Sequence, residues 1–408
     1  MRCLLGAEKE SEFHMKKLAT LGSMVVVSAL LAVSCTTLED IPGSETSEIE
    51  ESAPEVEEEL VRELFEPIPP AIENPLTWET LVERSEELPG IVYDDVYVTI
   101  ERNKQSSGYN DVEYTLYRSP NLADLHYAEI DSWLDDMFAL YANTVQPDSE
   151  IYIAFPYEDL EWAVELLSDP RVNHPDYEVI VRNANQGPEQ GSRQNAVPGM
   201  QPGTWQGIWL LPATLGPEPG VYPSFAVHEE SLINHEYAHQ VQQRQFKDEN
   251  LNSRFAGMAV GVPCFLMEGT ARIPELALIF DTPEEFAVGM GTRDGAYLYD
   301  PESADELGNF TVVTYLTEEV TVEYAENYLR TSLEPKCDAG NQYALGYSLG
   351  YLAVEGLAAI GGVESTMNLF TRIGYHDIPF EEAFEGIYGI TWEEAVPILA
   401  ALIAKEYG

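Results

Sequence analysis

The sequence predicts an α+β fold, with a small mixed α/β N-terminal lobe at residues 75–215 and a mainly helical C-terminal lobe at residues 216–408. Short apolar segments of strand length lie between residues 91 and 211, whereas almost every apolar run after residue 225 repeats at helical spacing. About 330 residues follow Pro75, which is enough to bury a substantial core in two lobes.

The first 35 residues have the pattern of an export signal. Lys16 and Lys17 precede the apolar run Leu18–Val33, which is too short for a stable membrane span. The ending AVSC, at residues 32–35, resembles a bacterial lipobox. This resemblance implies cleavage before Cys35, lipid attachment there, and export to a bacterial cell-envelope membrane. An ordinary cleaved signal peptide with an incidental cysteine is the alternative. Residues 1–14 carry no targeting pattern.

Residues 36–74 are expected to form a flexible acidic tether. Residues 39–66 hold twelve acidic residues and one basic residue, so this segment repels itself and buries little apolar surface.

The whole chain has 21 basic and 71 acidic residues, for a formal net charge of −50. Nucleic acid and anionic membrane surfaces are therefore poor partners, because both would be repelled. Contact with a membrane is expected through the N-terminal lipid only.

The N-terminal lobe is expected to mix strands and helices. Ile91–Glu101 and Val112–Arg118 alternate apolar and polar residues on either side of the turn-like KQSSGYND, which predicts a β-hairpin. The following segments are expected to be a helix at 122–138, a strand at 150–155, a helix at 158–167, a strand at 177–181, a long loop at 184–204 and an apolar strand at 205–211.

The chain after Glu268 is expected to be entirely helical. Apolar residues at helical spacing, separated by short connections that often contain Gly, predict helices at 283–290, 312–329, 342–360, 363–374, 379–388 and 392–405.

The stretch Phe225–Phe246 carries the most specific pattern, because His235, Glu236 and His239 stand in the order HExxH. On an α-helix, residues four apart lie one above the other, so both imidazoles project from one face with Glu236 beside them. Neutral imidazoles bind zinc, and a neighbouring carboxylate can deprotonate a water at the open coordination position. The pattern predicts two ligands of one Zn(II) ion and a catalytic base.

A second apolar segment, CFLMEGTAR at residues 264–272, has a single carboxylate at its centre, Glu268. HEYAH followed by FLMEGTA resembles the gluzincin zinc metallopeptidases, with a peptidase MA-like domain, in which a Glu from a following helix completes the zinc site. The resemblance implies a zincin-like fold over residues 205–405, with Glu268 as the third ligand. Glu275 stands where related families place a carboxylate that orients a zinc-bound His, although Pro274 is expected to distort that helix.

The stretch NQYALGYSLGY, at residues 341–351, resembles a helix with a YxxG pattern in the same family. The resemblance implies that the Tyr343 hydroxyl stabilises the oxyanion of the reaction, with Gly346 at the matching glycine. Tyr347 and Tyr351 repeat Tyr343 at helical spacing, so a core aromatic residue is the alternative.

The strand before the HExxH helix contains Trp205, Gly207 and Ile208. In gluzincin peptidases the strand at this place is a sheet edge on which the substrate lies as an added strand. The resemblance implies the same role here, which would give affinity without strong sequence preference. A buried central strand is the alternative.

The four cysteines reduce to Cys264 and Cys337 once Cys3 is discounted and Cys35 is lipidated. In a compartment that permits oxidation we expect a disulfide between these two, which would tie the Glu268 helix to the Tyr343 helix. Two buried free thiols are the alternative.

These patterns together predict zinc-dependent peptide hydrolysis by a metal-activated water, on a peptide or protein substrate at the exterior face of a membrane. Endopeptidase action is favoured, because the sequence has no motif such as GxMEN that would capture an α-amine. The alternative is a lipid-anchored binding protein that keeps the fold without catalysis.

Overall fold

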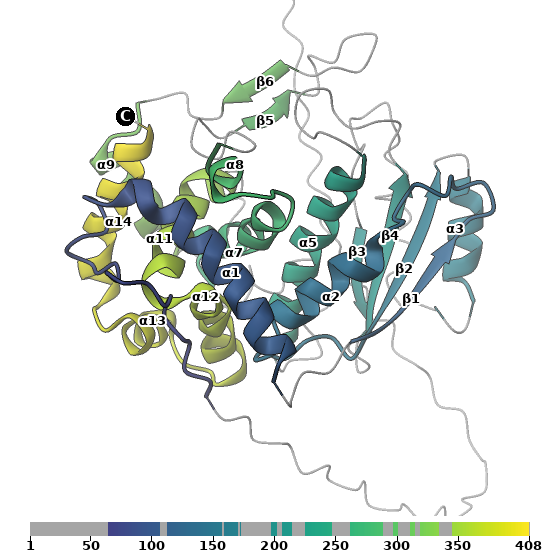
Figure 1. Cartoon of the computed structure of the whole chain (residues 1–408), viewed down its shortest axis with the longest axis horizontal. Coiled ribbons are helices and arrows are strands. Elements are labelled where there is room, and N and C mark those ends of the chain that lie inside the picture. Colours follow the sequence, from purple (N-terminus) through teal and green to yellow (C-terminus); the bar gives the residue numbers. More distant parts are fainter. Residues whose placement is uncertain are drawn as a thin grey trace, which may run out of the picture. The chain divides into compact units, whose positions relative to one another are not determined.

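The computed structural model describes most of the chain after residue 63 (Figure 1). Residues 62–408 form one compact unit, and the other unit, Met1–Val61, contains none of the described residues. The export signal, Cys35 and most of the expected tether therefore lie outside the described residues. The described ranges are 64–106, 112–156, 159–169, 172, 197–201, 206–213, 225–246, 262–288, 297–300, 311–314, 319–333 and 345–407.

A four-stranded sheet contains three parallel strands, β1 (Glu113–Arg118), β2 (Ser149–Pro156) and β4 (Gln206–Ala213). The fourth strand, β3 (Val197–Gln201), pairs with β4 in the antiparallel direction, so the strand order is β1-β2-β4-β3. The inner strand β2 is buried from Glu150 to Phe155, as expected for a parallel strand covered on both faces.

Helices cover both faces of this sheet. Ile151, Ile153 and Phe155 pack with the buried side chains of α3 (Leu160–Leu167) on one face. On the other face, Tyr152 belongs to the main core, which also contains α2 (Ile130–Leu140) and α5 (Phe225–Arg244). The sheet and α2 thus support the buried side of α5.

The expected β-hairpin is wrong. Ile91–Glu101 lies inside a helix, α1 (Leu88–Lys104), which follows a short 3₁₀ turn, η1 (Ser85–Glu87). The β-branched residues of this segment suggested a strand, but its buried positions, including Val92, Val96 and Ile100, repeat every four residues and pack on other helices. β1 pairs instead with β2, as a parallel neighbour.

The remainder of the described chain is mostly helical, so the protein is a mixed α/β structure dominated by helices. None of the described helices alone has the length and apolar run that crossing a bilayer requires. The helices α13 (Phe380–Tyr388) and α14 (Trp392–Tyr407), which are bent by 73° relative to each other, together reach that length and apolar character. The helical elements are α7 (Cys264–Ala277), α8 (Pro283–Val288), α9 (Val322–Thr331), the π-helix η6 (Gly346–Gly350), α11 (Tyr351–Gly361), α12 (Val363–Phe370), the π-helix η7 (Thr371–Tyr375), α13 (Phe380–Tyr388) and α14 (Trp392–Tyr407).

The expectation of an entirely helical chain after Glu268 is also wrong. Two short strands, β5 (Tyr297–Asp300) and β6 (Thr311–Thr314), pair in the antiparallel direction. The helix expected to start at residue 312 starts at Val322, because the Thr321 side chain caps it by accepting a hydrogen bond from the Tyr324 amide.

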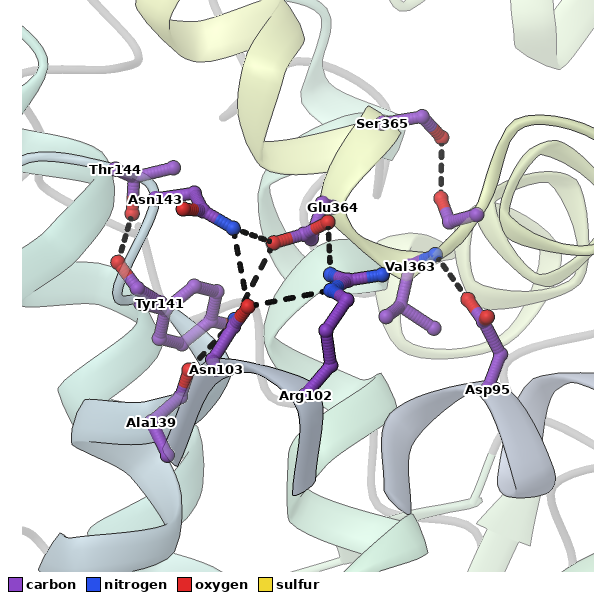
Figure 2. Close-up of polar contacts among 11 residues, drawn as sticks. Asp95, Arg102, Asn103, Ala139, Tyr141, Asn143, Thr144, Val363, Glu364 and Ser365 are labelled. Atoms are coloured by element: carbon purple, nitrogen blue, oxygen red, sulfur yellow. Dashed lines mark hydrogen bonds and ion pairs between the residues drawn. The ribbon is translucent and has the colours of Figure 1, made fainter. Parts of the chain in front are cut away.

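A buried polar network joins the N-terminal helix α1 to the C-terminal helix α12 (Figure 2). Glu364 accepts hydrogen bonds from Arg102 at 2.5 Å and from Asn143 at 2.7 Å, and Asn103 also reaches it. Asp95 accepts a hydrogen bond at 2.7 Å from the Val363 amide at the start of α12. Helices from both ends of the described chain therefore form one framework around α7.

Glycines allow α7 and η6 to cross at very short range. A Cβ atom added to Gly269 would lie 2.7 Å from the Gly350 carbonyl oxygen, and one added to Gly350 would lie 2.7 Å from the Phe265 carbonyl oxygen. A side chain at either Gly269 or Gly350 would therefore collide with the backbone of the facing helix.

We expect Gly269→Ala to lower the melting temperature in thermal unfolding, because overpacking of this kind costs about 1–3 kcal/mol. Gly90→Ala is the matched control, since nothing lies within 4 Å of the added Cβ on α1 and alanine is the better helix former. A Gly269→Ala protein as stable as wild type would contradict the close crossing.

Candidate metal centre

The helix α5 supplies two imidazoles and one carboxylate to the candidate site. His235 and His239 lie one turn apart, with ring centroids separated by 4.7 Å and ring planes nearly perpendicular. Their Nε2 atoms point at each other across 3.0 Å. Glu236 is half-buried, while Ile233 and Tyr237 are buried in the core that anchors the helix. The sequence of α5 therefore fixes one side of the helix and leaves the imidazoles facing α7.

The helix α7 brings Glu268 to the same point. Its side chain is fully buried, and Oε2 lies 3.3 Å from the Nε2 atom of both His235 and His239. Ligand atoms around a tetrahedral zinc ion with bonds of about 2.0–2.1 Å are about 3.3 Å apart, so the three separations fit one shared cation. Among the described residues, this is the group whose geometry could hold a metal ion.

Within the described part of the chain, both carboxylate oxygens of Glu268 are buried with no hydrogen-bond donor other than the two imidazoles. A buried polar atom without a partner normally costs a few kcal/mol, and a buried carboxylate costs more. Gly346 packs on the Glu268 side chain, where an added Cβ would lie 3.0 Å from the Glu268 Cβ. A cation, or protons on the imidazoles, can compensate the buried negative charge of this carboxylate.

His235 is oriented by a second carboxylate on α7. Glu275 Oε2 lies 2.7 Å from His235 Nδ1, and Glu275 Oε1 accepts a hydrogen bond at 2.5 Å from Arg272. Although Pro274 lies inside α7, the helix continues to Ala277, and Glu275 reaches the imidazole. This contact directs the Nε2 atom of His235 toward Glu268.

Two neighbours of the imidazoles were missed in the sequence. Gln242 Oε1 lies 2.9 Å from His239 Nδ1, and the Tyr347 ring stacks on His235 with a centroid separation of 5.6 Å. The spacing of Gln242, three residues after His239 on one helix, was the available signal. No local pattern identified Tyr347, because its contact depends on how η6 packs against α7.

Electrostatics in the metal-free site favour protonated imidazoles. Burial alone would lower the pKa of His235, but Glu275 and Glu268 outweigh it and raise the pKa to about 10. Burial would also lower the pKa of His239, but the Glu268 carboxylate outweighs burial, so the pKa of His239 is raised. Burial would raise the pKa of Glu268, yet His239 and His235 hold it well below its usual range. Burial raises the pKa of Glu236 against the opposing pull of both imidazoles.

Several predicted residues lie outside the described part of the chain. These include Trp205, Tyr343 and Cys337. Cys264 is disulfide-bonded, and its partner also lies outside the described residues, so the pairing with Cys337 stays a prediction.

The expectation of an open sheet edge at Gly207 and Ile208 is wrong. β4 is paired on both sides, by β2 and by β3, so it is the buried inner strand that was the alternative. β3 was hidden in a stretch interpreted as a loop, because Pro198 and Gly199 are typical of turns. Gly207 instead leaves room for the buried Glu150 carboxylate, with which an added Cβ would collide.

We expect metal binding at pH 7 to release at least one proton, because the pKa of His235 is raised to about 10 and metals bind neutral imidazole. In the metal-free protein, protonated His235 stabilises the folded state. This contribution is complete below the usual pKa of 6.5 and is lost as the pH rises through about 10. Titration calorimetry with zinc, in buffers of different ionisation enthalpy, measures the released protons. A binding enthalpy that is independent of the buffer would contradict this charge state.

Comparisons of the chain with protein-family models, with curated proteins and with solved structures gave no match. The functional conclusion therefore depends on the geometry of the site itself: a buried His-His-Glu group that could hold a metal ion.

Proposed function

We propose that the protein is a zinc-dependent peptide hydrolase of gluzincin type. The observation that carries the proposal is the convergence of His235, His239 and Glu268 beside the half-buried carboxylate of Glu236. Two histidines and one glutamate are a donor set typical of catalytic zinc, which leaves a coordination position for water or substrate. Harder cations such as magnesium prefer oxygen ligands alone, so the two imidazoles favour zinc.

The chain's own residues would divide the reaction among them. Bound zinc would supply Lewis acidity and lower the pKa of water. Glu236 would accept a proton from the attacking water and pass it to the nitrogen of the leaving amine. The raised pKa of Glu236 suits the first transfer, because it makes the carboxylate a stronger proton acceptor. Tyr343, by its resemblance to the family, would donate a hydrogen bond to the developing oxyanion.

The orienting contacts support catalysis by limiting motion of the metal ligands. Glu275, itself paired with Arg272, fixes the ring of His235, and the crossing of α7 with η6 fixes Glu268. Partners of this kind typically change metal affinity or activity about 10- to 100-fold when they are removed.

The proposal includes a zincin-like fold and endopeptidase action on peptides. It also includes export and lipid attachment at Cys35, with the acidic segment after it as a tether. The lipobox-like sequence and the charge distribution support these parts. Basic peptides would be the favoured substrates, because the net charge of −50 attracts them to the protein and repels acidic peptides.

We expect Glu236→Gln to retain zinc and to lose peptide hydrolysis by about 10²–10⁴-fold, since the amide keeps the shape of the side chain but accepts no proton. Zinc content and cleavage of a peptide library measure the two properties separately. Removing zinc with a chelator should abolish cleavage by the wild-type chain, and added zinc should restore it. A zinc-loaded wild-type protein that leaves the library as intact as Glu236→Gln does would favour the non-catalytic binding protein.

A further inference from the structure

We infer that Gln242 is a positioning residue of the metal centre, which fixes the tautomer of His239 and ties α5 to α7 beside Glu268. The inference rests on the metal centre of the proposed function. Gln242 is 3% exposed and makes two hydrogen bonds, one to the imidazole of His239 and one to the backbone of α7.

The orientation of the Gln242 amide follows from its α7 partner. Nε2 lies 2.9 Å from the Met267 carbonyl oxygen, which only accepts hydrogen bonds, so Nε2 is the donor there. A reversed amide would place two acceptors against each other. The Gln242 Oε1 atom therefore faces His239, and Nδ1 of His239 must carry the hydrogen that it accepts at 2.9 Å. When His239 is neutral, the state that binds a metal, its lone pair is therefore on Nε2, the atom that faces His235 and Glu268.

The second bond of Gln242 acts on the third ligand. Met267 is the residue directly before Glu268, so a bond to its carbonyl sets the position of α7 relative to α5 at the metal centre. One amide side chain thus controls both sides of the 3.3 Å separation between His239 Nε2 and Glu268 Oε2.

The two imidazoles have unlike partners. His235 faces the carboxylate of Glu275, whereas His239 faces a neutral amide. Glu236, Glu268 and Glu275 already place three carboxyl groups at this site. A neutral acceptor at position 242 orients His239 without adding a fourth carboxylate to the three that Arg272 and one divalent cation would already have to balance.

The test compares Gln242→Met with Gln245→Met in the full chain. Methionine has a similar volume and removes both hydrogen bonds. Gln245 follows the last residue of α5 and is also a buried amide, but its side chain forms hydrogen bonds with Val145, Val241 and Thr371 rather than with a metal ligand. Zinc affinity is measured by competition with a chelator. We expect it to fall about 10- to 100-fold in Gln242→Met and to stay unchanged in Gln245→Met, even if both lose similar stability.

A spectroscopic readout separates positioning from general destabilisation. In zinc-loaded protein with ¹⁵N-labelled histidine, we expect a protected Nδ1–H resonance of His239 in wild type and in Gln245→Met, and its exchange with solvent in Gln242→Met. Gln242→Glu keeps the acceptor for His239 but not the donor for Met267, so it should retain the resonance and lose less affinity than Gln242→Met.

Equal zinc affinity in Gln242→Met and Gln245→Met overturns the inference, and so does a wild-type chain that binds no zinc. A wild-type chain that binds zinc but cleaves no peptide overturns the proposed function alone, because neither readout requires hydrolysis.

Discussion

The structure depends on placing one carboxylate, that of Glu268, between two imidazoles in a fully buried position. Among the described residues, its oxygens have no hydrogen-bond partner apart from these imidazoles, so the free energy of this arrangement is favourable only when positive charge is shared with His235 and His239. The glycine crossing of α7 with η6 serves the same constraint, because side chains at Gly269 or Gly350 would push α7 away, and one at Gly346 would press on Glu268 itself. A π-helix at this position agrees with the frequent occurrence of such turns at functional sites.

Successive layers of side chains support the site. Next to the imidazoles lie Glu275 with Arg272, and Gln242 with the Met267 carbonyl. Beyond them, apolar side chains of α5 and α7 join the main core, and the network around Glu364 connects α1 with α12 at a greater distance. Each layer restricts the one inside it, which is the condition for ligand atoms to stay in place before a metal binds.

The sequence allowed the local part of this site to be predicted and left the non-local part hidden. Helical spacing alone places His235 and His239 on one face, since four residues make about one turn. The contact of Gln242 with the Met267 carbonyl is invisible in sequence, because it depends on the packing of two helices. Ile91–Glu101 is rich in β-branched residues and was mistaken for a strand, since its burial against other helices outweighs intrinsic preference. Pro198 and Gly199 concealed β3 for the opposite reason, since residues typical of turns occupy a strand at the sheet edge.

The most direct test of this account is the position of the metal itself. Anomalous diffraction at the zinc edge, from crystals of the zinc-loaded chain, locates the ion without reference to activity. The account predicts one strong peak, with the Nε2 atoms of His235 and His239 at about 2.0–2.1 Å and a Glu268 oxygen at about 2.0–2.2 Å. A peak elsewhere, or a Glu268 side chain turned away from the ion, would contradict it.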